Sequence, residues 1–267
     1  MTESALSQTM KRNKIELTFS ITYTGFVYEE SFTLHQSKIL SVFWTLEPVQ
    51  EFGPLSLLTQ VIGTDLSPIQ PPWVPPNCVF EIDDFETPWL YRADFDFIHG
   101  RELEGCIANE DQLFSRAFEY LKPGGYFEIA GANPYFFSDN DTHKRAPSCQ
   151  LLIENIHIAA NKFGKSFDNV PLWKAKMEKA GFLDVKESIY KFPIGPWPKD
   201  PKLKEIGRFQ QVQQIQVVES YTPALFSRVL GWTNAEIQAL IAKAKKELKD
   251  PSLHLYVPIH FVYGRKP

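Results

Sequence analysis

The sequence predicts an α/β domain with a mostly parallel sheet, and three observations favour this class. From Val61 onward, short apolar runs of strand length alternate with longer segments whose apolar residues recur at helical spacing. Glycine or proline stands at the end of several of these segments, where it ends a helix or forms a turn. The chain has 267 residues, 43% of them apolar, and is therefore long enough to bury a large core.

The pattern before residue 61 is less regular. Residues 14–34 alternate apolar and polar side chains on both sides of Thr24-Gly25, which predicts a β-hairpin. The apolar run SKILSVFWTLEPV, residues 37–49, predicts a buried strand. The stretch EFGPLSLLTQ that follows is interrupted by Gly53 and Pro54, so it predicts no regular helix.

Four strands and one helix are predicted in the next part of the chain. The strands are VIGTD (61–65), CVFEIDD (78–84), FDFIHG (95–100) and YFEIAG (126–131). The proline-rich connector SPIQPPWVPP between the first two strands excludes a regular helix over most of its length. Residues 111–122 have one apolar face and predict a helix that begins at Asp111 and is stopped by Pro123-Gly124-Gly125.

The last part of the chain predicts mainly helices. One is expected over residues 151–164, ended by Gly164, and a second over 173–181, with Gly181 at its C-terminal cap. A strand follows at 182–193. Three further helices are expected over 202–218, 222–231 and 234–249, the last of them capped by Thr233-Asn234. The chain closes with an alternating strand, LHLYVPIHFVYG.

Charge and composition restrict the partners. The formal net charge is −4 and the sequence pI is near 5.9, so we expect no binding to nucleic acid. Cys78, Cys106 and Cys149 lie far apart with no CxxC pair, which favours a reducing compartment and argues against a metal site. No segment approaches the ~20 apolar residues of a membrane span. We therefore expect an intracellular protein, in the cytoplasm or the nucleus, without a membrane partner.

Acidic residues end two neighbouring strands of the predicted sheet. Asp65 ends the first, and Asp83 and Asp84 end the second. A carboxylate at this edge of a parallel sheet can accept hydrogen bonds from both vicinal hydroxyls of a ribose, which is the role we predict for Asp65. Asp84, with Asp83 beside it, could accept a hydrogen bond from the exocyclic amine of an adenine. The alternative for Asp65 is a turn cap.

Several motifs together resemble one family. They are VIGTDLSPIQPPWVPPNCVFEIDDFETPW, FDFIHGRELEG, LKPGGYFEIA, the block KFPIGPWPKDPKLKEIG and the tail HLYVPIHFVYGRKP. In combination they are similar to the fungal LaeA-like methyltransferases, which are S-adenosylmethionine-dependent enzymes and regulators of secondary metabolism. The resemblance covers residues 61–267. It implies a Rossmann-like fold with a mostly parallel sheet of seven strands, an antiparallel last strand, and the cofactor across the carboxyl ends of the strands.

The resemblance also implies roles for individual residues. It assigns Asp65 to the ribose hydroxyls of S-adenosylmethionine, Asp84 to the adenine amine with Asp83 as its neighbour, and residues 99–101 to the border of the methyl group. Residues 61–267 would form the methyltransferase-like domain, with a substrate cover around 133–235, and residues 1–60 a divergent N-terminal segment. A small molecule is the expected acceptor, and a protein partner in a regulatory complex is a second expectation.

If methyl transfer occurs, His99 is the candidate general base. The alternative for His99 is a histidine that is hydrogen-bonded at the end of its strand. Glu102 and Glu104 are expected at the start of a helix, where they would interact favourably with its dipole. Four tryptophans could shape the substrate space or pack in the core: Trp73, Trp89, Trp173 and Trp197.

The sequence departs from the family before Val61. Methyltransferases of this kind carry a glycine-rich loop some twenty to thirty residues before the ribose acid, because glycine lets the backbone approach the cofactor closely. Here the corresponding stretch has one glycine, Gly53, and Glu47 as the strand-end acid is followed directly by Pro48. The segment could be divergent or wrongly assembled, or another backbone arrangement could hold the cofactor. In the third alternative, the fold serves as a catalytically silent regulatory partner or as a pocket for a non-methylating cyclisation.

Overall fold

The computed structural model describes residues 15–23, 26–34, 38–43, 60–68, 74, 76–91 and 95–267, and only the backbone of those before residue 60. Two strands, β1 (Ile15–Tyr23) and β2 (Phe26–Leu34), form an antiparallel hairpin in a sheet of their own. The predicted hairpin is confirmed. The stretch predicted to lack the glycine-rich loop, after Phe43 and before Gln60, lies outside the described residues.

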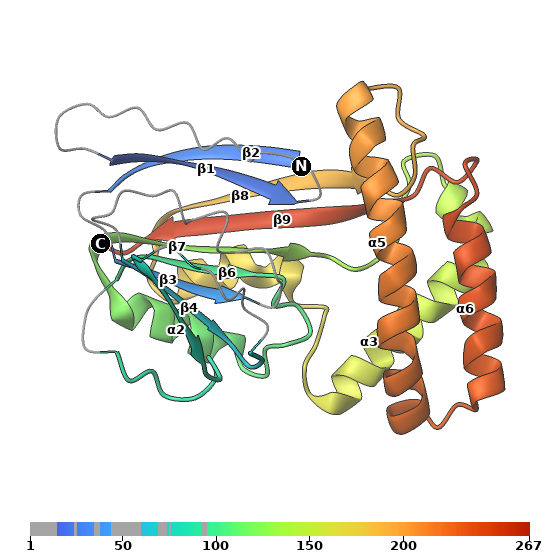
Figure 1. Cartoon of the computed structure of the whole chain (residues 1–267), viewed down its shortest axis with the longest axis horizontal. Helices are drawn as coiled ribbons and strands as arrows, with labels where there is room; N and C mark the ends of the chain where they lie inside the picture. The colour runs from blue at the N-terminus through green and yellow to red at the C-terminus, as the bar shows by residue number, and fades with distance from the viewer. Residues whose placement is uncertain are drawn as a thin grey trace.

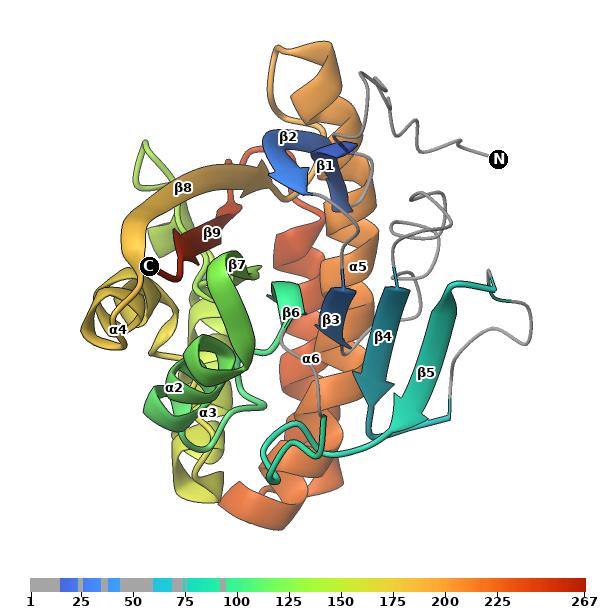
Figure 2. The same cartoon turned by 90° about the vertical axis from the view of Figure 1, so that its left-hand side faces the viewer.

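A second sheet of seven described strands has the order β5-β4-β3-β6-β7-β9-β8 (Figure 2). Its strands are β3 (Lys38–Phe43), β4 (Gln60–Asp65), β5 (Cys78–Ile82), β6 (Phe95–Arg101), β7 (Leu121–Ala132), β8 (Leu183–Pro193) and β9 (Tyr256–Arg265). The five neighbouring strands β5, β4, β3, β6 and β7 pair in parallel, and β9 is antiparallel to both of its neighbours, β7 and β8. The Rossmann-like α/β class is confirmed. Strand β3, part of the segment that we predicted to be divergent, lies in the middle of this sheet.

The strand order reverses beside β3. The chain steps outward from β3 to β4 and β5, and it then returns to place β6 on the other side of β3. In open α/β sheets, ligands bind beyond the carboxyl ends of the strands at such a reversal. The residues that follow β4 on one side and β6 on the other are therefore the ones to examine for a site.

Two helices, α2 (Glu110–Tyr120) and α4 (Trp173–Lys179), pack together beside the sheet around a buried apolar cluster that includes Phe114, Phe127 and Trp173. The predicted α2 needs two corrections. Its N-cap is Asn109, whose side chain accepts a hydrogen bond from the Gln112 N–H, and not Asp111. It also ends at Tyr120, because Leu121 already has an extended backbone and begins β7.

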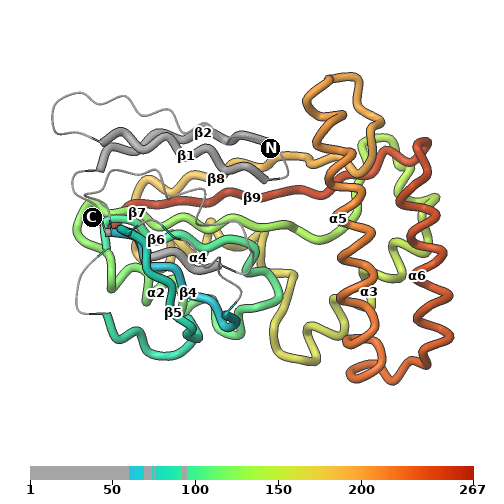
Figure 3. Tube along the Cα trace, viewed as in Figure 1, coloured from blue at the N-terminus to red at the C-terminus, as the bar shows by residue number. Residues whose placement is uncertain are grey.

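Three long helices stand at the end of the sheet toward which β6 and β7 run (Figures 1 and 3). They are α3 (Pro147–Phe163), α5 (Pro201–Leu225) and α6 (Asn234–Leu248), and they share one apolar cluster with β7, β8 and β9. The expected caps of α3 at Gly164 and of α6 at Thr233 are confirmed. We refer to residues 133–235 as the cover.

One expectation for the cover is wrong. The helices predicted over 202–218 and 222–231 are a single element, because α5 runs through Pro223 and continues directly into a π-helical segment, Phe226–Leu230. Thr222 and Phe226 on either side of the proline are fully buried. Their packing offsets the hydrogen bond that a proline removes from a helix.

The block GPWPKDPKLKEIG joins the cover to the sheet. The Gly195 N–H donates a hydrogen bond to the Gly207 carbonyl of α5, and the Trp197 indole N–H donates to the Leu255 carbonyl just before β9. A Cβ atom at Gly207 would lie 2.1 Å from the Gly195 carbonyl oxygen, so only glycine fits there. Across the described residues, no helix has the length and apolar content that a membrane crossing would require.

Candidate functional site

Asp65 is the last residue of β4 and is 8% exposed. Its Oδ1 accepts a hydrogen bond from the Ser67 N–H at 2.8 Å, so the expected turn-capping role is present. Its Oδ2 is buried and has no hydrogen-bond partner among the residues that the structure describes. A buried carboxylate oxygen without a partner is energetically costly. A hydroxyl group of a ligand that donated a hydrogen bond to Oδ2 would remove this cost.

Asp83 and Asp84 lie beside Asp65 at the end of β5. The Asp83 N–H donates a hydrogen bond to the Asp65 carbonyl at 3.1 Å, which joins the two strand ends. One carboxylate oxygen of each residue is used locally: Asp83 accepts from the Asp84 N–H, and Asp84 accepts from the Glu86 N–H. Two exposed apolar side chains, Leu66 and Ile82, stand next to these acids. Acidic and apolar groups therefore alternate along this edge.

His99 lies inside the core. Its ring is 1% exposed, the Glu128 side chain is 0% exposed, and His99 Nδ1 lies 3.0 Å from Glu128 Oε1. The ring of Phe97 stacks beside it at a centroid distance of 6.1 Å. This geometry favours the hydrogen-bonded alternative, because a general base must reach the acceptor. Its catalytic role stays a prediction.

Glu102 and Glu104 follow β6 and are not at a helix start, because α2 begins at Glu110. Glu102 has a positive φ of 52°, so the chain turns sharply there. Both residues line a cavity of about 120 Å³ that lies under the cover. Its apolar wall includes Phe136, Ile153, Ile156, Phe167, Val217 and Val257. The expected helical position is therefore corrected to a turn that faces a cavity.

The Glu104 carboxyl group is held at one oxygen and free at the other. Its Oε1 accepts a hydrogen bond from the Ala132 N–H at 3.0 Å, while Oε2 is sealed from solvent and has no hydrogen-bond partner in the described part of the chain. A Cβ atom at Gly131 would lie 2.4 Å from Oε2, so the glycine makes room for the carboxylate. Burial, and next the Glu102 carboxylate, raise the pKa of Glu104 to about 8.

The carboxylates of Asp65 and Glu104 both act on the pKa of the Cys106 thiol. Burial, and next the Glu104 carboxylate, raise its pKa to about 12, and the Asp65 carboxylate acts in the same direction. Asp65 and Glu104 therefore lie in one electrostatic neighbourhood. Lys165, just after α3, donates hydrogen bonds to Glu86 Oε2 at 2.5 Å and to the Cys106 carbonyl at 2.6 Å. This lysine ties the cover to the loops that follow β5 and β6.

A polar network in the cover was missed by the sequence reasoning. His157 Nδ1 lies 2.7 Å from Asp168 Oδ1, which also accepts a hydrogen bond from the Tyr135 hydroxyl at 2.9 Å. Although burial works against it, hydrogen bonds from Asn161 and Tyr135 hold the pKa of Asp168 below its usual value. No local pattern signals this network, because the chain brings its members together only after α3 ends at Gly164.

Trp89, Trp173 and Trp197 are not among the described residues that line the cavity beside Glu102 and Glu104. Trp173 is buried and donates its indole N–H to Glu110 Oε1, and Trp89 donates its own to the Phe85 carbonyl. Trp197 binds the Leu255 carbonyl, as described above. These contacts favour the core-packing alternative. Trp73 lies outside the described residues.

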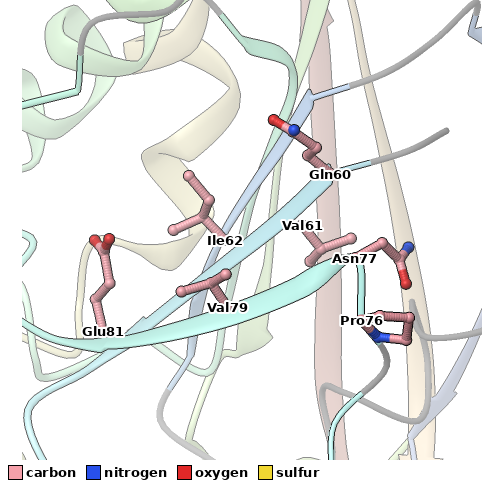
Figure 4. A pocket seen from close by; sticks show the side chains of 7 residues that line it. All are labelled: Gln60, Val61, Ile62, Pro76, Asn77, Val79 and Glu81. Carbon is pink, nitrogen blue, oxygen red and sulfur yellow. The ribbon is translucent and has the colours of Figure 1, made fainter. Parts of the chain in front are cut away.

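A larger cavity, of about 460 Å³, lies along β4 and β5 (Figure 4). Its lining includes Gln60 and Ile62 of β4, Asn77 just before β5, and Val79 and Glu81 of β5, so it covers the amino-terminal half of β4 and extends along β5 to its carboxyl-terminal half. Among the described residues, no group of three or more His, Cys, Asp or Glu side chains could hold a metal ion.

Comparisons with known proteins point to one family. The family model described as "Methyltransferase domain" matches residues 44–187. Methyltransferase pytC of Aspergillus terreus is 33% identical over 207 residues, which are 78% of this chain and 64% of that protein. The chain thus spans slightly less than two thirds of the length of pytC.

Two further relatives extend this result. Probable methyltransferase tdiE of Emericella nidulans is 31% identical over 223 residues, 82% of this chain and 69% of that protein. Secondary metabolism regulator LAE1 of Cochliobolus heterostrophus is 28% identical over 244 residues, 87% of this chain and 77% of that protein. The predicted resemblance to LaeA-like proteins is confirmed.

Proposed function

The chain belongs to the methyltransferase domain family, and from that premise we propose that it transfers a methyl group from S-adenosylmethionine to a small-molecule acceptor in fungal secondary metabolism. The names of the relatives, two methyltransferases and one regulator of secondary metabolism, support this proposal. The observation that carries it is the buried Oδ2 of Asp65 at the carboxyl end of β4, which has no hydrogen-bond partner among the described residues.

The Asp65 carboxylate fits a ribose. Both vicinal hydroxyls of a ribose are donors, and an ionised carboxylate accepts hydrogen bonds only. One oxygen is already held by the Ser67 N–H, which fixes the orientation of the group, and the other has no partner in the described part of the chain. A ligand hydroxyl would remove the cost of leaving Oδ2 without a hydrogen bond.

The end of β5 fits an adenine beside that ribose. Asp84, with Asp83 as its neighbour, would accept a hydrogen bond from the adenine amine, and the exposed Leu66 would cover one ring face. Strand β6 lies two strand positions from β4, on the far side of β3, which corresponds to about 10 Å. The turn after β6 would therefore lie within reach of the rest of a cofactor whose ribose Asp65 holds.

Bound S-adenosylmethionine would supply a methyl group on a positively charged sulfur, which is already activated for transfer. The main contribution of the chain is then to hold the acceptor in line with that methyl group and to exclude water. The cover and the turn formed by residues 102–104 are the elements that border the acceptor in this proposal. Both elements follow Asp65 in the sequence.

Isothermal titration calorimetry with S-adenosylmethionine tests the proposal. We expect wild type to bind in the micromolar range and Asp65→Asn to bind about 10- to 100-fold more weakly, because hydrogen bonds to a charged group contribute about 1.5–3 kcal/mol. The control is Asp111→Asn, which changes an exposed carboxylate on α2 and should leave the affinity within about twofold of wild type.

Two results would contradict the proposal. Equal affinity of wild type and Asp65→Asn would show that the carboxylate does not hold the ribose. No heat of binding with wild type would instead favour the catalytically silent protein that the sequence left open as an alternative.

A further inference from the structure

The cavity of about 120 Å³ has a distinct chemical character. Two carboxyl groups, those of Glu102 and Glu104, and the amide groups of Gln213 and Gln214 line it. Among the described residues that line it, the rest are apolar apart from Tyr221 with its hydroxyl, and none is a lysine or an arginine. A cavity of this kind suits a neutral or cationic apolar molecule. Above about pH 8, where Glu104 loses its proton, it disfavours an anion, because two carboxylates would then repel a negative charge in a site of low dielectric constant.

Among the polar groups that line this cavity, the Glu104 carboxyl group is positioned to accept a hydrogen bond and a proton. The Ala132 N–H holds its Oε1 at 3.0 Å, and Gly131 leaves room for its Oε2, which has no partner among the described residues. Burial raises the pKa of Glu104 most, the Glu102 carboxylate raises it further, and Arg101 lowers it. The net result, a pKa of about 8, makes the group a base whose strength is matched to neutral or mildly alkaline solution.

Two buried histidines near the sheet and cover are weaker candidates for that role. His99 is sealed in the core beside Glu128 and is not among the residues that line the cavity. His157 is 4% exposed, its ring is covered by Tyr135 at a centroid distance of 4.1 Å, and it does not line the cavity either. Among these three side chains, only Glu104 borders the space that an acceptor would fill.

We propose that Glu104 binds the O–H or N–H group of the methyl acceptor and takes its proton, in a pocket that admits neutral or cationic aromatic-sized molecules and rejects anions. This inference rests on the proposed methyl transfer. As the acceptor's O–H bond breaks, Glu104 receives the proton and the electron pair of the acceptor forms the bond to the methyl carbon. The former methyl–sulfur bond leaves its electron pair on the sulfur.

Three matched fluorinated probes test the pocket without any knowledge of the natural acceptor: 4-fluorophenol, fluorobenzene and 4-fluorobenzoate. Fluorine NMR titration at pH 8.5 measures their dissociation constants. We expect wild type to bind 4-fluorophenol at least tenfold more tightly than fluorobenzene and to give no detectable binding of 4-fluorobenzoate. In Glu104→Gln, the preference for the phenol over fluorobenzene should fall below threefold, and 4-fluorobenzoate should begin to bind.

Two controls locate the probes. Val217→Trp narrows the cavity from α5 without touching the carboxyl groups, and it should weaken 4-fluorophenol and fluorobenzene by the same factor. S-adenosylhomocysteine should not displace 4-fluorophenol from wild type, because the proposed acceptor pocket and cofactor site are separate. Displacement, or an unchanged phenol preference in Glu104→Gln, would overturn the inference. So would failure of all three probes to bind wild type at millimolar concentration.

The outcomes for the two proposals can be told apart. The probe titrations need no cofactor, so they assess the pocket even if S-adenosylmethionine fails to bind. If S-adenosylmethionine binds in an Asp65-dependent way but Glu104→Gln keeps the phenol preference, the proposed function stands and only the role of Glu104 fails. Circular dichroism of Glu104→Gln and Val217→Trp verifies that each variant is folded.

Discussion

The Glu104 carboxyl group makes the stability of the fold depend on pH. Its pKa is about 8 in the folded chain, against 4.5 for the ordinary group, so between these values the unfolded chain has lost the proton that the folded chain keeps. Stability therefore falls as pH rises from about 4.5 to about 8 and changes little beyond. Each tenfold difference in proton affinity corresponds to about 1.4 kcal/mol, so the loss amounts to a few kcal/mol.

Glu104→Gln should remove this loss, because glutamine keeps the acceptor for the Ala132 N–H and cannot ionise. Urea unfolding of both proteins at pH 5 and pH 8 measures the effect. We expect the variant to have a higher free energy of unfolding than wild type at pH 8. The difference between the two proteins should be larger at pH 8 than at pH 5. If the difference between the two proteins is the same at both pH values, Glu104 does not titrate in this range in the folded chain.

Among single residues, the sequence was informative where position in a strand decides the environment. Asp65 could be predicted as an acid at a strand end, and the structure adds only that one of its oxygens is free within the described part of the chain. The expectation of a helix start for Glu104 is wrong because the burial of this residue depends on Gly131, Ala132 and the cover, all distant in sequence. Local patterns contain no information about such contacts.

At the scale of elements, three ion pairs among the described residues join α2 to α4: one at the buried Glu110 and two at the exposed Asp111, whose Oδ1 also lies 3.9 Å from Lys176 Nζ. Lys176 Nζ lies 2.7 Å from Glu110 Oε2, and Glu110 also accepts the Trp173 indole N–H. Lys179 Nζ lies 2.7 Å from Asp111 Oδ2 at the exposed surface. Glu110→Ala should lower the free energy of unfolding by about 2–4 kcal/mol, because it leaves a buried donor and a partly buried ammonium group without their acceptor.

Asp111→Ala is the matched control, one residue away on the same helix. Its pair with Lys179 is exposed and screened by solvent, so chemical denaturation should give a stability close to that of wild type. Similar losses in both variants would mean that α2 depends on charge at its first turn and not on the buried contact. The test therefore separates the helix dipole from the packing of α2 on α4.

The elements themselves were predicted unequally. The strands β4 and β6 were found within one residue of their ends, because buried parallel strands are continuous apolar runs bounded by turns. The sequence predicts two helices over 202–218 and 222–231 where the structure has α5 running through Pro223, and the burial of Thr222 and Phe226 beside the proline favours the continuous helix. The strand β3 could be expected as a strand, but its place between β4 and β6 inside the sheet could not, since pairing partners are a long-range property.

For the whole molecule, the two ends of the sheet compete as ligand sites. The larger cavity covers the amino-terminal half of β4 and extends along β5 to Glu81, whereas the strand order favours a site beyond the carboxyl ends. Val79 and Leu66 offer a matched pair, because their side chains are 55% and 54% exposed at these opposite ends. Val79→Lys should leave the affinity for S-adenosylmethionine within about twofold of wild type, whereas Leu66→Lys should weaken it at least tenfold because a charged chain replaces the apolar contact with the adenine. Calorimetry on both variants decides between the ends. A loss of binding in Val79→Lys alone would move the cofactor to the larger cavity and leave Asp65 as a turn cap.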